Sequence, residues 1–169
     1  NEKTYKVNER MTTLSYEAHV KYTGRRFSFA AKSLLASCLD HTALIGGYGI
    51  SSVRPDNGEQ EYTPFRHSTS WVNFTCGTKW KGHFFAGYTK NLGTADALVS
   101  ATKYGMGLDI DQVFSTNIAF SYNLPHWQIG LEYMPTTAWY GDTDRASGKV
   151  VDTHSVTNHR VLGLVMYYF

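Results

Sequence analysis

The stretch His159-Arg160-Val161-Leu162-Gly163-Leu164-Val165-Met166-Tyr167-Tyr168-Phe169 ends the sequence and determines the fold that we predict from it. Counting back from its last residue in steps of two selects an uncharged set: Phe169, Tyr167, Val165, Gly163 and Val161. A β-strand returns to the same face at every second residue, so this set forms one apolar face. The run is also about as long as a transmembrane β-strand, which needs about 9–11 residues. The stretch therefore predicts a strand with one face suited to lipid.

This stretch resembles the C-terminal signature of Gram-negative outer-membrane β-barrel proteins, whose last strand alternates hydrophobic positions and ends in Phe. The resemblance implies that the barrel-assembly machinery recognises one set of residues as a signal, namely Gly163, Val165, Tyr167 and Phe169. Taken alone, the residues leave a second interpretation open, the last strand of a soluble β-sandwich. The rest of the chain decides between the two.

The composition suits one sheet-forming domain over residues 1–169, because 15 Gly and 4 Pro favour many turns and 15% of the residues are aromatic. No apolar run is long enough for a transmembrane helix, which needs about 18 residues. The mean hydropathy of −0.34 does not exclude a membrane strand, in which only alternate residues face lipid. A scattered net charge of +2 gives no reason to expect nucleic acid as a partner. Residues 1–6 contain no signal peptide, so we expect a mature, trimmed or partial chain.

Seven segments alternate between apolar and polar residues and are therefore predicted as strands. Short turns separate some of them, at residues 23–25, 81–82 and 125–126. Long polar segments separate the others, at residues 37–68, 91–111 and 141–158, the first with a short strand near 43–50. The predicted strands are residues 12–22, 26–36, 69–80, 83–90, 112–124, 127–134 and 159–169.

Short and long connections alternate strictly along the chain, as periplasmic turns and extracellular loops do in outer-membrane barrels. We therefore predict an all-β fold, an antiparallel transmembrane β-barrel in the outer membrane and in contact with its lipid. Bacterial barrels have even strand numbers, whereas seven strands are counted here, so we expect the C-terminal part of a larger barrel. The alternative counts residues 42–51 as a strand of a small eight-stranded barrel, which would lose the alternation of connections.

Several stretches together resemble the C-terminal half of the DcaP-like porins: Gln60-Glu61-Tyr62-Thr63-Pro64, Thr69-Ser70-Trp71, residues 85–93, and Tyr122-Asn123-Leu124-Pro125 with Trp127. The resemblance covers most of the chain and agrees with the odd strand count. It implies a trimeric outer-membrane channel for small solutes, dicarboxylates among them, built on a barrel of roughly 16 strands. None of these stretches is a catalytic or ligand motif.

If the apolar faces meet lipid, the alternate faces line the interior of the barrel. Five basic and two acidic side chains are then candidates for lining a pore: Lys21, Arg26, Lys32, Lys79 and Arg160, with Glu17 and Glu132. A basic excess would favour anions, although these residues could equally pair with one another as structural bridges. The last strand departs from the pattern, because Leu162, Leu164 and Met166 would point inward. An inserted loop or a neighbouring subunit could cover them.

No cofactor is expected from the sequence, and no enzymatic activity. Cys38 and Cys76 have no metal-ligand spacing, and nothing indicates a disulfide between them. The seven His residues are scattered, and Asp109 with Asp111 supplies too few ligands for a calcium site. No nucleophile motif of an outer-membrane lipase or protease is present. The predicted function is passive diffusion of small hydrophilic solutes, with anions preferred; a non-conducting barrel for adhesion or structure is the alternative.

Overall fold

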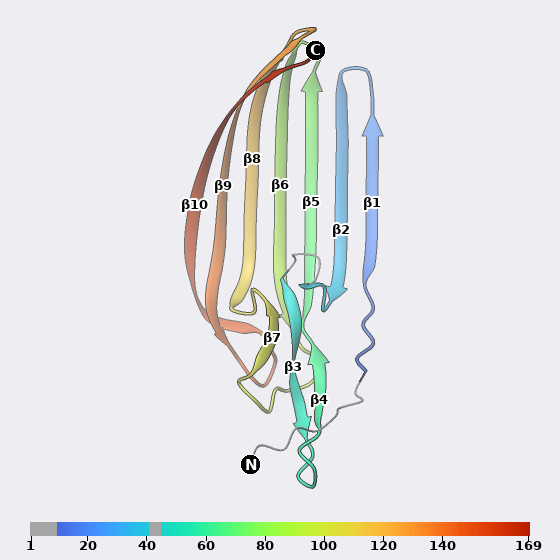
Figure 1. The fold of residues 1–169 in the computed structure, drawn as a ribbon, viewed down its shortest axis with the longest axis vertical. Coiled ribbons are helices and arrows are strands. Elements are labelled where there is room, and N and C mark those ends of the chain that lie inside the picture. The colour runs from blue at the N-terminus through green and yellow to red at the C-terminus, as the bar shows by residue number, and fades with distance from the viewer. Residues whose placement is uncertain (1–9, 41–44) are drawn as a thin grey trace.

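The computed structural model describes residues 10–40 and 45–169, which form antiparallel β-sheets (Figure 1). Seven strands form a long sheet in the order β1-β2-β5-β6-β8-β9-β10. Their bounds are β1 Tyr16–Thr23, β2 Phe27–Ser37, β5 Arg66–Gly77, β6 Trp80–Gly93, β8 Ile110–Asn123, β9 Trp127–Thr143 and β10 Val150–Tyr167. Each predicted strand overlaps one of these seven. The all-β antiparallel fold predicted from the sequence is confirmed.

The three short turns and the end of β10 lie at one end of the long sheet, here called the turn end (Figure 1). The longer connections lie at the opposite end, the loop end. The predicted alternation of connections is therefore confirmed as a feature of the sheet. Because the sheet has seven antiparallel strands, β1 and β10 run in the same direction.

The long sheet is open in the part of the chain that the structure describes. β1 pairs only with β2, and β10 pairs only with β9. The antiparallel sheet of the predicted barrel is present, and its closure is not. Two strand edges are left with free backbone N–H and C=O groups, which readily accept further strands.

The predicted loop 37–68 contains two strands, β3 (Gly46–Val53) and β4 (Gln60–Pro64), and the loop 91–111 contains β7 (Lys103–Met106). These form a second sheet of three strands at the loop end, in the order β4-β3-β7 (Figure 1). The short strand predicted near 43–50 corresponds to β3, although residues 41–44 lie outside the described part. Because β3 pairs with β4 and β7 and not within the long sheet, the eight-stranded alternative is wrong.

The predicted loop 141–158 is also wrong, because β9 and β10 continue through most of it. Its hydrophilic character indicated a loop, but its polar residues pair with β9: Thr157 lies opposite Thr137, and their hydroxyls are 2.9 Å apart. The connection shrinks to residues 144–149, where the Gly148 N–H donates to the Asp144 carbonyl over 2.8 Å. The Ser147 hydroxyl and the Ala146 N–H bind the Asp144 carboxylate and hold its pKa below the usual range.

Few apolar side chains are buried, and most of those lie near the second sheet. Phe65, Leu98 and Leu108 form a small cluster. The Phe65 N–H donates to the Gly47 carbonyl of β3, and a Cβ on Gly49 would lie 2.6 Å from the Leu98 side chain. The long sheet, in contrast, keeps large apolar side chains exposed along its strands. Its stability in isolation cannot come from a conventional core.

Close backbone approach between β3 and β7 generates a first prediction. Gly47 and Gly105 face each other at φ values of 143° and 145°, and a Cβ on Gly105 would lie 2.1 Å from the Gly46 carbonyl oxygen. Replacing Gly105 with Ala should therefore cost about 2 kcal/mol or more and open the β3–β7 pairing. Hydrogen exchange of the β3 and β7 amides measures the loss.

The matched control is Gly58→Ala, at φ 73° with no atom within 4 Å of the added Cβ. It should cost only about 1 kcal/mol, from backbone conformation alone. Equal protection of the β3 amides in both variants would contradict the close approach.

Candidate functional site

One face of the long sheet carries a continuous band of exposed apolar side chains, here called the hydrophobic face. Cross-strand register aligns one residue from each of the seven strands in a single row: Tyr22, Phe29, Phe74, Phe84, Ile118, Tyr133 and Val161. Val161 is 68% exposed and Ile118 is 49% exposed. Soluble monomeric proteins rarely expose an apolar patch of this extent. This face is therefore suited to contact with an apolar surface.

Aromatic rings concentrate on the hydrophobic face near the turn end. Trp80 and Tyr122 have ring centroids 4.4 Å apart, and Trp127 and Tyr167 have centroids 4.8 Å apart. Trp and Tyr are enriched where a protein crosses from lipid to water, because their rings are amphipathic. The band thus ends in the residues typical of a membrane interface.

The predicted assembly signal lies on the same face. Gly163, Val165 and Tyr167 alternate with polar-face residues of β10, and Phe169 follows the strand with its side chain fully exposed. The Tyr168 N–H donates to the His126 carbonyl over 2.8 Å, so pairing with β9 continues past the end of the strand. The terminal residues are thus held at the turn end.

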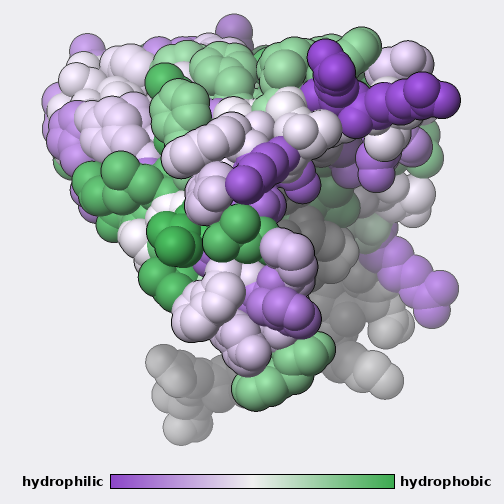
Figure 2. Space-filling model, turned by 90° about the horizontal axis from the view of Figure 1, so that it is seen from above, coloured by the Kyte–Doolittle hydropathy of each residue, from purple (hydrophilic) through white to green (hydrophobic). Residues whose placement is uncertain are grey.

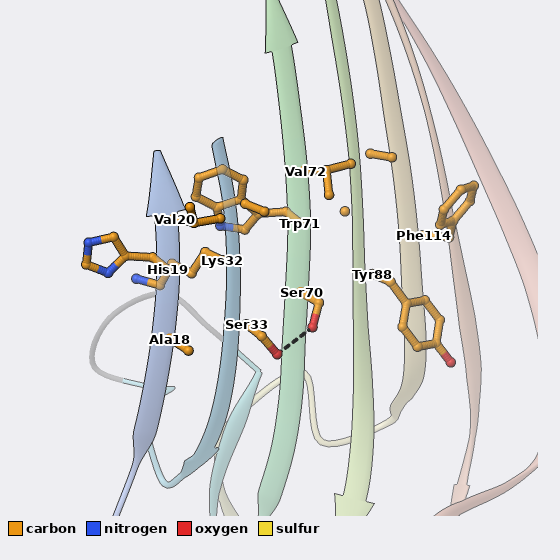
Figure 3. Close-up of a pocket in the computed structure, with 13 residues that line it drawn as sticks. Ala18, His19, Val20, Lys32, Ser33, Ser70, Trp71, Val72, Tyr88 and Phe114 are labelled. Carbon is orange, nitrogen blue, oxygen red and sulfur yellow. Dashed lines mark hydrogen bonds between the residues drawn. The ribbon is translucent and has the colours of Figure 1, made fainter. Parts of the chain in front are cut away.

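A hollow of about 500 Å³ interrupts the hydrophobic face across β1, β2, β5, β6 and β8 (Figure 3). It arises because the side chains of β1 and β2 here, such as those of Ala18 and Ala31, are small, whereas those of Tyr88 and Phe114 on β6 and β8 are large. Two hydroxyl groups in it satisfy each other, Ser33 Oγ and Ser70 Oγ at 2.9 Å. The hollow is therefore a depression in the hydrophobic face with no free polar group in these two hydroxyls.

The opposite face of the long sheet, here called the polar face, carries two ion pairs. Lys32 Nζ lies 2.6 Å from Glu17, and Arg160 contacts the Glu132 carboxylate at 2.5 Å. Four of the seven predicted pore-lining residues are thus structural bridges, as the second sequence interpretation had it. Both acidic candidates are neutralised by these contacts.

The three remaining candidates, Lys21, Arg26 and Lys79, have no carboxylate partner among the described residues. Lys21 lies on the polar face within β1, and Arg26 lies at its turn end. Lys79 differs from the prediction: it lies in the β5–β6 turn, and its amino group is 5.1 Å from the ring of Tyr122, a residue of the hydrophobic face. The polar face therefore keeps its uncompensated charge near the turn end.

Sequence reasoning missed two further cations there, Arg25 and Lys81, because both were assigned to turns. β6 begins at Trp80, so Lys81 is a strand residue, and it pairs with Gly77. Lys81 and His83 are two residues apart, and this spacing could have indicated that Lys81 lies on the polar face of the strand. Figure 2 looks onto the turn end: strongly hydrophilic residues (purple) gather on the right of the view, the side on which β1 and β2 lie in Figure 1.

The apolar residues of β10 that were predicted to point inward do lie on the polar face. Leu162 is 48% exposed and Leu164 is 37% exposed. With Phe85 and Gly130 they line a hollow of about 340 Å³. No described segment of the chain covers them.

Neither cysteine forms a disulfide; both thiols are free. The described residues include no group of three or more His, Cys, Asp and Glu side chains that could hold a metal ion. They also include no helix with the length and hydrophobicity needed to cross a membrane. Comparison of the chain with protein-family models, with curated proteins and with solved structures gave no match.

Proposed function

We propose that the long sheet is part of the wall of an outer-membrane β-barrel channel, through which small hydrophilic solutes diffuse without a cofactor or chemical reaction. The observation that carries this proposal is the separation of the two faces. An exposed apolar band runs across all seven strands, whereas the opposite face carries the ion pairs and the unpaired cations, with apolar exceptions such as Leu162 and Leu164. A spanning sheet must satisfy its backbone internally and present apolar residues to lipid, and only a closed barrel does both.

Strand direction sets a condition on how the proposed barrel would close. β1 and β10 run the same way, so an all-antiparallel barrel needs an odd number of additional strands between them. A barrel of roughly 16 strands, as the resemblance to DcaP-like porins implies, meets this condition. The same resemblance supports a trimer assembled by the barrel-assembly machinery.

The charge distribution supports a preference for anions. Glu17 and Glu132 are neutralised within ion pairs, whereas Lys21, Arg26 and Lys81 have no carboxylate partner among the described residues. Unpaired charges of one sign along a pore raise the local concentration of ions of the opposite sign. Each cation contributes modestly, because water and salt screen it.

The lipid-facing role of the hydrophobic face is tested with two adjacent phenylalanines. Phe84 lies on the hydrophobic face and Phe85 on the polar face, where its ring is 6.2 Å from that of Trp71. Phe84→Lys should cost about 2–4 kcal/mol near the membrane midplane and block assembly in lipid. Phe85→Lys, the matched control, loses the contact with the Trp71 ring and part of the lining of the hollow beside Leu162 and Leu164, and should still assemble because it does not face lipid. Heat-modifiable migration of membrane fractions in electrophoresis reports assembly, and equal assembly of both variants would contradict the proposal.

The channel itself is tested in planar bilayers. The wild type should conduct, with a reversal potential in a salt gradient that favours anions. Glu17→Gln with Glu132→Gln should increase that preference, because Lys32 and Arg160 lose their partners. Lys21→Glu should reduce it. A folded protein that does not conduct would leave the non-conducting barrel as the better description.

The terminal signal is tested by deleting Phe169. This residue contributes no buried surface to the sheet, so its loss should leave the stability of the folded barrel nearly unchanged. Assembly in cells should nevertheless fall several-fold, because the resemblance to outer-membrane barrel proteins implies that the machinery recognises Phe169. Substituting the neighbouring Tyr168, which alternates to the other face, serves as the control. Normal outer-membrane levels without Phe169 would overturn this role.

A further inference from the structure

The turn end of the polar face contains a depression with three cations around it. Its lining includes Arg25, Arg26 and Lys81, and its volume is about 380 Å³. A water molecule takes up about 30 Å³ of liquid, so a small polyatomic ion fits with part of its hydration shell. None of the three cations has a carboxylate partner among the described residues. The depression is thus a concave site with uncompensated positive charge.

Backbone register places Arg26 and Lys81 on either side of Gly77. The Gly77 N–H of β5 donates to the Arg26 carbonyl over 2.7 Å, and Gly77 pairs with Lys81 on β6. Neighbouring strands are spaced about 4.8 Å apart, so the backbones of Arg26 and Lys81 are about 10 Å apart. Gly77 places no side chain between them. Two long side chains can therefore reach one ion from opposite sides.

Gly77 is required at that position for a second reason. Its φ is 111°, and a Cβ would lie 1.9 Å from the Trp80 carbonyl oxygen. The tight β5–β6 turn thus excludes every other residue from the gap. The same turn geometry that connects the strands keeps the space between the cations open.

Hydroxyl groups complete the lining of the depression. Thr23, Ser28 and Thr75 come from β1, β2 and β5, and the register places them side by side on the polar face. Hydroxyls donate hydrogen bonds to oxygen atoms without adding charge, and a guanidinium presents paired donors that match a phosphate or a carboxylate. Three positive charges are more than one monovalent anion would neutralise. The combination suits a compact dianion with several acceptor oxygens.

We infer that this depression binds a phosphate-type oxyanion, held by Arg25, Arg26 and Lys81 with the neighbouring hydroxyls. The phosphate group can belong to a free solute, such as inorganic phosphate or a phosphate monoester, or to a phospholipid headgroup at the end of the sheet. Phe27, whose side chain belongs to the hydrophobic face, also lines the depression. The depression therefore borders both faces, and a lipid headgroup can reach it as well as a free solute. The inference does not require that the protein conducts ions.

The test is equilibrium binding of inorganic phosphate to the full chain, folded in an uncharged detergent at low ionic strength. Calorimetric titration should show saturable binding that weakens as sodium chloride is raised, since screening shortens to about 3 Å at 1 M salt. Arg26→Gln with Lys81→Gln should weaken binding at least about tenfold, because charge-assisted contacts are lost from both sides. The matched control, Arg145→Gln with Lys149→Gln, makes the same charge change in the connection 144–149 and should bind like the wild type.

A second arm distinguishes the two sources. The wild type is purified from vesicles containing phosphatidylglycerol, and the retained lipid is counted by native mass spectrometry. Retention that the Arg26/Lys81 variant loses, without any binding of free phosphate, assigns the site to a headgroup. Binding of neither phosphate nor lipid, or binding unchanged in the variant, overturns the inference.

Folding of the variants is checked by circular dichroism. Arg26 is exposed and Lys81 is half-buried, and neither side chain forms an ion pair with a described residue, so folding should be retained. The single variants Arg26→Gln and Lys81→Gln, each weakening binding about threefold or more, give the same answer should the double variant not fold. A phosphate site that fails this test leaves the conductance test of the channel unaffected.

Discussion

Cross-strand register is the constraint on which the rest of this structure depends. Each strand of the long sheet alternates its faces with a period of two, so a shift of one residue between neighbours would move apolar side chains to the polar face. No such shift occurs along the row from Tyr22 to Val161. Where register changes, as between Arg66 and His67 or between Val151 and His154, it does so at the loop end, beyond the apolar band.

The connections at the two ends of the sheet differ in length and in what they form. At the turn end the connections have only two or three residues, Gly77 leaves no room for a Cβ beside the β5–β6 turn, and Arg25, Arg26 and Lys81 surround one depression. At the loop end, the chain has enough length to build a second sheet, and the close approach of Gly47 to Gly105 ties segments that are far apart in the sequence. The buried apolar cluster belongs to this end. The molecule therefore has a packed, water-excluding part at one end and a two-faced wall along the rest.

The polar face shows why charge should be counted after pairing. By residue count it carries a basic excess spread over several strands. Ion pairs between neighbouring strands remove Glu17, Lys32, Glu132 and Arg160 from that count. What remains lies near the turns, where short connections leave no acidic neighbour. Any electrostatic effect of the sheet on solutes should therefore be strongest at its turn end.

The sequence by itself determined the seven strands, their apolar faces and the alternation of short and long connections, because each depends on local periodicity or on turn residues. The sequence did not predict that β9 and β10 extend into residues 141–158, because a single polar segment gives no sign that its side chains pair with those of another strand. Only the tertiary structure decided which cations are paired, because Lys32 meets Glu17 through register between two strands. It also placed β3 in a second sheet with β4 and β7 and gathered Arg25, Arg26 and Lys81 around one depression. Those juxtapositions depend on pairing between distant segments, which no local pattern encodes.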